Sequence, residues 1–317
     1  MKSFFLWPRS KKLWIKDFFG FAPSNDQIEG MLKALYPEAE PVLFSSARAG
    51  LSAILQAEGL TRNDLVWHPN YSSHCVLESI ARYATPTPVL NENVKAALIY
   101  HQWGFKHQAI FDPSVIIIED SVDSLLIPNT NPFLIGGAFA LWSLPKVFGT
   151  MGGGVVFCRD FDDAKKLRNI RAQRTISKLE KLIRFFLKFN SSFNSYWGGT
   201  ESLQGDVLGI YRHQIKRALE EIELVVSRQK MLLEKVAPHM VDQFKKNSRY
   251  PSNLPVKVKL GDINLINNHL KFEAGPRHFN AGKSCPEQTW EKVYPIPVHI
   301  DVEFEDIFLY LKDFMEK

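Results

Sequence analysis

The sequence of 317 residues predicts an α/β protein built on a mixed, mostly parallel sheet. The first observation is that apolar segments of strand length recur at 64–68, 96–101, 115–119 and 155–158. The second is that helical patterns separate most of these segments, which is typical of parallel strands joined by covering helices. The third is a hydrophobic content of 45%, which suffices for one large domain and a smaller one.

A short helix is expected over 25–36, and Phe44–Glu58 should contain a turn followed by a helix with Leu51, Ile54 and Leu55 on one face. A turn and a helix should fill 69–84. Beyond Asp160 the pattern turns helical, and we expect helices over 161–174, 178–189, 209–236 and 306–315, with short strands and loops over 254–300. We place the domain boundary between 1–205 and 206–317.

Charge and cysteine content narrow the class of protein. The net charge of +5 is modest, so it favours anionic small molecules without requiring nucleic acid. The three cysteines are far apart and have no CxxC spacing, which predicts a reducing, cytoplasmic environment without a disulfide framework. The histidines show no metal-ligand spacing, and we expect no metal site.

The chemistry of the chain centres on the segment 139–158, FALWSLPKVFGTMGGGVVFC. Lys146 lies between apolar residues, and a lysine removed from water becomes available as a neutral nucleophile. The glycines that follow permit tight turns and a close approach of backbone to a ligand. The alternative is a solvated lysine in a glycine-rich loop.

Two upstream segments complete the pattern. In VIIIEDSVDSLL (115–126), an apolar strand ends in Glu119 and Asp120, where open α/β sheets place ligand-binding groups. In FSSARAGLSAIL (44–55), small and hydroxyl residues lead directly into a helix, whose first backbone N–H groups suit an anion. An anion cradle, an acidic strand end and a lysine therefore follow one another.

These three segments resemble the DegT/DnrJ/EryC1/StrS family of sugar aminotransferases that depend on pyridoxal 5'-phosphate (PLP), in a divergent branch associated with surface polysaccharides. The resemblance is clearest over residues 40 to 175. It implies the fold type I of PLP-dependent transferases, similar to aspartate aminotransferase. It also implies a homodimer with a shared active site, and amino transfer, with glutamate as a plausible donor, to a keto sugar carried on a nucleotide.

The resemblance also implies roles for individual residues. Lys146 would bind PLP covalently and move the proton during amino transfer; relatives with His at this position run dehydrations instead. Asp120 would pair with the pyridine nitrogen of PLP. The phosphate would bind at Ser143 and at the turn Ser46-Ala47-Arg48, where Ala47 replaces the usual glycine and needs a negative φ. Arg48 is equally consistent with a surface cap.

Two departures from the family pattern concern the cofactor ring. Relatives often have a packing residue near Ser73 that covers one face of the ring, and here the nearest candidates are Tyr71, Ser73 and His74. Asp123 stands where relatives have a residue that reaches the phenolic oxygen of PLP. Its negative charge would disturb that oxygen unless the carboxyl is protonated or turned away.

Substrate contacts are predicted more weakly. His101, in YHQWGF, resembles a His-x-Tyr-Gly segment of the family, and is equally consistent with a structural histidine at a strand end. Arg277 and His278, in GPRHFNAG, are candidates for contact with a nucleotide-sugar diphosphate, because arginine suits phosphate.

Two segments rich in basic and aromatic residues leave alternatives open. Residues 1–22 and 178–189 are consistent with weak contact to a membrane surface, but we favour packing on the domain or on a partner subunit. An alternative function is a catalytically degenerate family member that acts as a binding or scaffold protein. PLP chemistry other than amino transfer, such as dehydration, is a third possibility.

Overall fold

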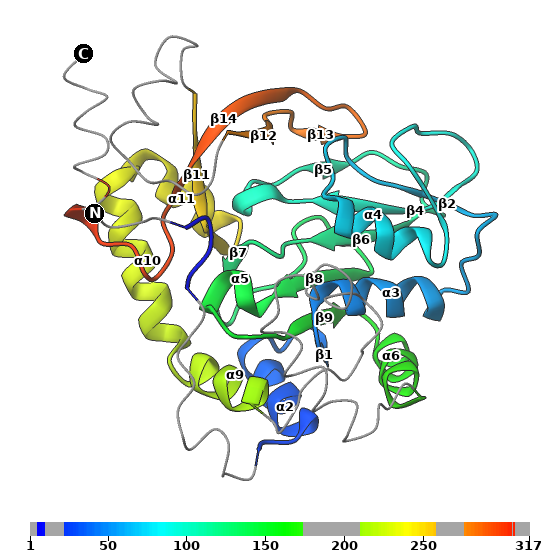
Figure 1. Cartoon of the computed structure of the whole chain (residues 1–317), viewed down its shortest axis with the longest axis horizontal. Coiled ribbons are helices and arrows are strands. Elements are labelled where there is room, and N and C mark those ends of the chain that lie inside the picture. The colour runs from blue at the N-terminus through cyan, green and yellow to red at the C-terminus, as the bar shows by residue number, and fades with distance from the viewer. Residues whose placement is uncertain (1–4, 10–21, 174–209, 258–275, 306, 308–317) are drawn as a thin grey trace, which may run out of the picture.

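The computed structural model describes residues 5–9, 22–173, 210–257, 276–305 and 307 (Figure 1). The predicted helix over 178–189 and the predicted domain boundary at 205/206 lie outside these residues, as does the predicted C-terminal helix except for Ile307. Among the helices of the described ranges, none has both the length and the apolar character needed to cross a membrane.

A seven-stranded sheet forms the centre of the described structure, in the order β1-β9-β8-β6-β4-β2-β3. Only β9 runs against its neighbours, so the sheet is mixed and mostly parallel, as predicted. Its strands are β1 (Glu40–Phe44), β2 (Leu65–Trp67), β3 (Thr85–Thr87), β4 (Val94–Tyr100), β6 (Ile116–Asp120), β8 (Phe139–Ser143) and β9 (Gly154–Cys158).

Both faces of this sheet are covered, which explains why its strands read as nearly continuous apolar runs. Along β9, Val156 and Cys158 join the core beneath α3 (Ala47–Ala57), α4 (His74–Ala81) and α6 (Phe161–Gln173). The alternate residues Val155 and Phe157 join the core on the opposite face, which contains α2 (Asn25–Leu35), α9 (Ile210–Glu220) and α10 (Ile222–Val236). The period of two along a strand assigns each side chain to its face.

The C-terminal part adds α11 (Pro238–Lys246) and a three-stranded antiparallel sheet in the order β11-β14-β12. Figure 1 shows this sheet above the end of the central sheet, beside the helices α10 and α11. Two short strand pairs join the parts of the chain, β10 with β7 and β13 with β5. The strands are β5 (Gln108–Ala109), β7 (Ser124–Leu126), β10 (Arg249–Pro251), β11 (Asn253–Val256), β12 (Arg277–Asn280), β13 (Ser284–Cys285) and β14 (Trp290–Pro297).

The single long helix predicted over 209–236 is wrong. The structure has two helices, α9 and α10, which are separated at Glu221, whose φ of −99° and ψ of 5° are not helical. Ile215 and Leu219 before this break and Ile222 and Val225 after it are all buried in the same core. The apolar spacing therefore continues across the junction, and no glycine or proline marks it in the sequence.

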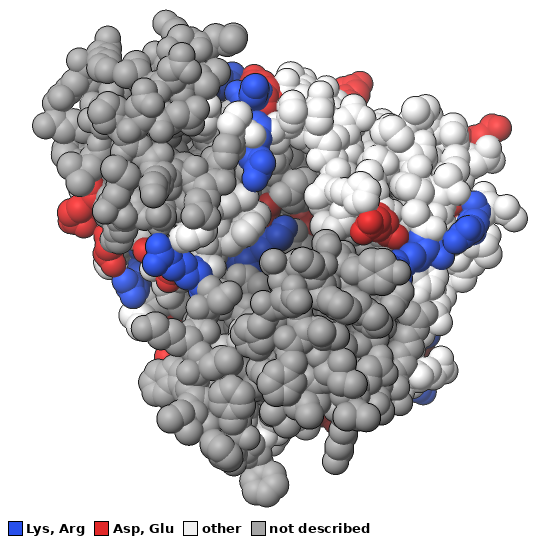
Figure 2. All heavy atoms as spheres, in the orientation of Figure 1, with Lys and Arg blue, Asp and Glu red and all other residues white. Residues whose placement is uncertain are grey.

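The surface of the described residues carries both signs of charge. On the face drawn in Figure 2, Lys and Arg side chains lie among Asp and Glu side chains instead of gathering in one patch. This mixture agrees with the modest net charge of +5.

Candidate active site

The functional site lies at the edge where the parallel strands of the central sheet end. Tyr100 and Asp120 are register partners at the ends of β4 and β6, and Ser143 ends β8 opposite Gly154. A cavity of about 720 Å³ opens here and is lined by these three strand ends. Ligands of open α/β sheets bind outside the carboxyl ends of the strands, so this is the expected place for a site.

Lys146 reaches the cavity from a short helix, α5 (Leu144–Phe148). Leu144, Val147 and Phe148 on this helix are buried, so the core fixes its position. Gly149 ends the helix with φ of 67°, a left-handed conformation that favours glycine. The lysine therefore lies on the wall of a cavity and not in a solvated loop.

Asp120 lies on the same cavity and is 6% exposed. Burial raises the pKa of its carboxyl group to about 6, the positive charge of Lys146 lowers it, and the neighbouring carboxyl of Asp123 raises it. Its Oδ1 accepts a hydrogen bond of 3.1 Å from the backbone N–H of Val122, which fixes its orientation. A buried carboxyl group and an amine thus line the same cavity.

The predicted anion cradle also faces this cavity. Ser46, Ala47 and Arg48 line it at the N-terminus of α3, where the first helical N–H groups have no partner within the helix. The Ser46 hydroxyl caps the helix by accepting a hydrogen bond of 3.1 Å from the N–H of Ala49. Ala47 is not among the residues with positive φ, which meets the condition for an alanine at this turn.

Gly154 allows this turn to lie against the start of β9. A Cβ atom at this position would lie 2.1 Å from the backbone nitrogen of Ala47. No side chain fits in that space, so the glycine determines how closely the cradle approaches the lysine loop. Ser143 completes this end of the cavity from β8.

The loop after β2 only partly matches the prediction. Ser73 lines the cavity at the N-terminus of α4, with its Oγ 3.3 Å from the Sγ of Cys75. His74 was predicted to bind the cofactor, but its side chain is 86% exposed and its Nδ1 lies 3.2 Å from Glu78 Oε1. The first turn of α4 directs His74 to an i,i+4 partner on the surface, so its side chain is not among those that line the cavity.

Asp123 does not line the cavity, contrary to its predicted contact with the cofactor. Its side chain is fully buried and accepts hydrogen bonds from the hydroxyl of Tyr100 and, at 3.0 Å, from the backbone N–H of Trp103. Burial and the Asp123 carboxyl raise the pKa of Tyr100 well above its ordinary value, so the phenol stays neutral. The carboxyl group is turned toward protein donors, one of the arrangements that spares the phenolic oxygen of a bound PLP.

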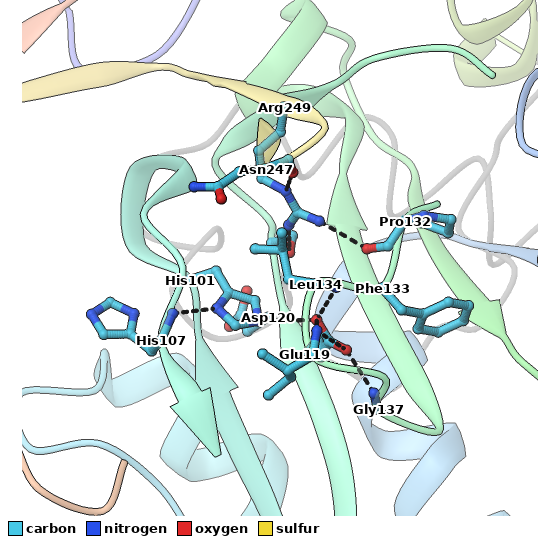
Figure 3. Close-up of polar contacts among 12 residues, drawn as sticks. His101, His107, Glu119, Asp120, Pro132, Phe133, Leu134, Gly137, Asn247 and Arg249 are labelled. Carbon is cyan, nitrogen blue, oxygen red and sulfur yellow. Dashed lines mark hydrogen bonds and ion pairs between the residues drawn. The ribbon is translucent and has the colours of Figure 1, made fainter. Parts of the chain in front are cut away.

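His101 belongs to a buried structural network and not to the cavity (Figure 3). Its Nε2 donates to Glu119 Oε2 at 3.0 Å, while its Nδ1 accepts from the N–H of His107 at 3.2 Å. This pattern fixes the neutral tautomer, and burial lowers the pKa of His101 to about 4. The structural alternative for His101 therefore holds.

Glu119 occupies the other face of β6 from Asp120. Backbone N–H groups of Leu134 and Gly137 donate to its carboxylate at 2.6 Å and 2.7 Å. Burial alone would raise its pKa, but the hydrogen bond from His101, the backbone N–H of Gly137 and the guanidinium of Arg249 hold the pKa of Glu119 below its ordinary value. Figure 3 shows Arg249 above this network, where it donates to Pro132 O at 2.9 Å and Asn247 O at 3.0 Å.

Arg277 and His278 lie on the rim of the cavity, at the start of β12. The ring of His278 stacks on Tyr71 with centroids 3.7 Å apart and an angle of 8° between the planes. Its backbone carbonyl accepts from the side chain of Gln102 at 2.9 Å. The C-terminal part of the chain thus closes one side of the site.

Several cavity residues were not predicted. Tyr100, Gln102 and Trp103 line the cavity around His101, which itself points away. Leu6 and Trp7 line it from the start of the chain, and the Nζ of Lys146 lies 4.7 Å from the centroid of the Trp7 ring. Trp103 has a positive φ of 53°, which changes the direction of the chain after β4. No sequence pattern predicts this conformation. Within the described ranges, no group of three or more His, Cys, Asp or Glu side chains is placed to hold a metal.

Comparisons with known proteins agree with this geometry. The family described as "Putative PLP-dependent aminotransferase" matches residues 28–313. No curated protein matches the sequence.

Solved structures show the same fold at low identity. PseC of Helicobacter pylori, an aminotransferase involved in the biosynthesis of pseudoaminic acid, is 12% identical, with a TM-score of 0.64 over 98% of this chain and 97% of that one. DesV of S. venezuelae, in complex with a ketimine intermediate, is 15% identical, with a TM-score of 0.57 over 93% and 89%. The GDP-4-keto-6-deoxy-D-mannose-3-dehydratase of E. coli is 14% identical, with a TM-score of 0.55 over 83% and 82%.

The family match spans most of the chain, and the fold and the lysine-carboxylate cavity agree with it. The chain belongs to this family of PLP-dependent aminotransferases.

Proposed function

We propose that this aminotransferase moves an amino group from glutamate to a keto sugar carried on a nucleotide, in the biosynthesis of a surface polysaccharide or a related glycan. One observation carries the proposal. Lys146, Asp120 and the N-terminus of α3 all face one cavity of about 720 Å³. An amine, a buried carboxyl group and an anion cradle are the three contacts that PLP needs at its aldehyde, ring nitrogen and phosphate.

The residues fit this cofactor. Because Gly154 has no Cβ, the backbone of Ser46 and Ala47 can pack directly against it at one end of the cavity. Helix termini of this kind bind phosphate through backbone N–H groups and the helix dipole. Ser143 adds a hydroxyl whose side chain makes no capping hydrogen bond at the start of α5.

PLP, when bound, supplies an electron sink that stabilises negative charge on the substrate carbon and carries the amino group between donor and acceptor. The protein contributes the rest. Lys146 holds the cofactor and then, as a free amine, moves a proton at the reacting carbon. Asp120 places negative charge at the ring nitrogen, which keeps that nitrogen protonated. The apolar wall formed by Leu51, Leu98 and Val122 keeps water from the reacting atoms.

The acceptor is proposed from the rim of the cavity and from the solved relatives. Arg277 and His278 lie at the opening, and Arg48 lies at the cradle. Guanidinium groups bind phosphate oxygens in bidentate fashion, so this opening suits a diphosphate. PseC is described as an aminotransferase in the biosynthesis of pseudoaminic acid, and the E. coli dehydratase is named for a nucleotide-linked keto sugar, which supports the same substrate class.

The two halves of the reaction can be tested separately. Purified protein saturated with PLP should convert to the amino form of the cofactor on addition of glutamate, with release of one 2-oxoglutarate per site. Addition of a nucleotide-linked keto sugar should then restore PLP and yield an amino sugar, identified by mass. Failure of every amino donor to change the cofactor would contradict the proposal, and loss of water without gain of nitrogen would indicate a dehydratase.

We also propose that the protein is a homodimer. This proposal rests on the family resemblance alone. Light scattering of the purified protein would test it, and a mass corresponding to one chain of 36.3 kDa would contradict it.

A further inference from the structure

The start of the chain lies beside the reacting lysine. Residues 5–9 run between α5 and β11, as the dark blue segment in Figure 1 shows. The carbonyl oxygen of Arg9 packs against Gly149 at the end of α5. A Cβ atom on residue 149 would lie only 2.2 Å from this oxygen. Within this segment, Leu6 and Trp7 line the cavity, and the Trp7 ring centroid is 4.7 Å from the Nζ of Lys146.

Three hydrogen bonds from the C-terminal part hold this segment in place. The side-chain amide of Asn253 donates to Leu6 O at 3.1 Å, and Nε2 of His299 donates to Phe5 O at 3.0 Å. The backbone N–H of Arg9 donates to Asp301 Oδ2 at 2.7 Å. Asn253 and His299 are buried, so two of these anchors belong to the protein interior.

The side chain of Trp7 also packs on apolar residues. It contacts the apolar cluster formed by Trp103, Phe279 and Val293. Because both its backbone and its ring are held, Trp7 presents a fixed aromatic surface to Lys146.

The loop after β2, where an aromatic cover for the cofactor was expected, contributes one aromatic side chain to the cavity, Tyr71. Tyr71 is 63% exposed and its ring is already stacked on His278, while the His74 side chain lies on the surface. Ser73, which also lines the cavity, has no ring. An aromatic ring that does lie beside the Lys146 amine comes from the start of the chain.

We propose that Trp7 is a cofactor-contacting residue, which packs against PLP bound at Lys146 and shields the bond between them from water. The inference rests on Lys146 as the lysine that holds PLP. An aromatic ring in contact with another contributes beyond its buried area. Loss of the ring should therefore weaken PLP binding by about tenfold and open the bond to small nucleophiles.

The test compares Trp7→Phe, Trp7→Leu and Trp7→Ala in the full-length protein. Two quantities are measured without substrate: the dissociation constant of PLP from an absorbance titration, and the rate at which hydroxylamine removes bound PLP. We expect Trp7→Phe to resemble the wild type and Trp7→Leu to be intermediate. Trp7→Ala should bind PLP about tenfold more weakly and lose it at least tenfold faster to hydroxylamine.

Two further variants separate contact from folding. Asp301 is exposed, and its carboxylate accepts the hydrogen bond from Arg9 N–H. Asp301→Ala removes this hydrogen bond but keeps the Trp7 ring, and it should accelerate the hydroxylamine reaction. Trp67→Phe makes the same substitution as Trp7→Phe, but at a buried tryptophan outside the cavity. It should leave the dissociation constant of PLP and the rate of the hydroxylamine reaction unchanged. Melting temperatures without PLP report any loss of stability on its own.

The proposal is overturned if Trp7→Ala binds PLP and reacts with hydroxylamine as the wild type does. It is equally overturned if Trp7→Ala changes only the melting temperature without PLP. If Lys146→Ala still forms the coloured complex, the assignment of the lysine fails instead, and the two failures are distinguishable.

Discussion

Asp120 and Lys146 face the same cavity from β6 and α5, and their charges are coupled. Burial raises the pKa of Asp120 to about 6, while the positive charge of Lys146 lowers it. The carboxyl group is therefore mostly ionised near physiological pH and takes up a proton in mildly acidic solution. A positive charge placed beside it, such as a protonated pyridine nitrogen, favours the ionised form further.

This coupling predicts the pH dependence of cofactor binding. Below about pH 6 the Asp120 carboxyl takes up a proton and no longer attracts the ring nitrogen, so PLP affinity should fall as the pH decreases. Titrations of PLP binding from pH 8 to about pH 5 measure this. The Asp120→Asn variant, which has no carboxyl to titrate, should bind weakly at every pH and lack the decline. An identical decline in the variant would contradict this role of Asp120.

The same residue should oppose folding when PLP is absent. The pKa of Asp120 is raised above its unfolded value, so its ionisation lowers stability as the pH rises from 3.8 to about 6, and the loss is complete above that pH. In Asp120→Asn the amide oxygen can still accept from Val122 N–H, and the buried charge is removed. We expect the free energy of unfolding of the PLP-free protein at pH 7.5 to increase by roughly 2–3 kcal/mol. Urea denaturation with and without PLP measures this, and a less stable PLP-free variant would contradict it.

His101 should govern acid stability rather than catalysis. Its pKa is lowered by burial to about 4, so the unfolded chain takes up its proton first as the pH falls below 6.5. The stability that neutral His101 contributes is therefore complete above pH 6.5 and is lost between pH 6.5 and about 4, by roughly 3 kcal/mol. His101→Gln should unfold more easily at pH 7.5 and show a weaker loss in this range. If the pH dependence of urea unfolding is the same in both proteins, His101 does not have this role.

The cradle should depend on the absence of a side chain at residue 154. In Gly154→Ala the new Cβ would overlap Ala47 N, so either β9 or the turn must move. We expect a loss of about 1–3 kcal/mol in stability and weaker binding of both PLP and inorganic phosphate. Gly30→Ala is the matched control, because nothing lies within 4 Å of its Cβ and it should stabilise α2 by about 0.5–1 kcal/mol. Unchanged phosphate binding in Gly154→Ala would show that the cradle lies elsewhere.

The sequence was informative where local chemistry and local structure coincide. The strands with Asp120 and Ser143 at their ends, the turn at Ser46 and the lysine of α5 each have a pattern within about ten residues, and all reach one cavity. The covered sheet made its strands apolar on both faces, which made them easy to recognise.

Local sequence patterns could not predict the contacts between segments that lie far apart in the chain. Trp7 approaches Lys146 through hydrogen bonds to residues 253, 299 and 301, which no spacing rule connects. His101 carried the recognisable motif, but its Nε2 turns to Glu119, and its neighbours Tyr100 and Gln102 face the cavity. A strand end fixes which residues are near a site, while tertiary packing decides which of them point into it.

The central claim is that Lys146 holds PLP. Visible absorbance of the purified protein with PLP, followed by borohydride reduction and peptide mass mapping, tests it most directly. We predict a coloured band that reduction abolishes and a phosphopyridoxyl group fixed on the peptide that contains Lys146. The band should be absent in Lys146→Ala and retained in the surface control Lys166→Ala. A band that survives in Lys146→Ala, or a label on another lysine, would contradict the account.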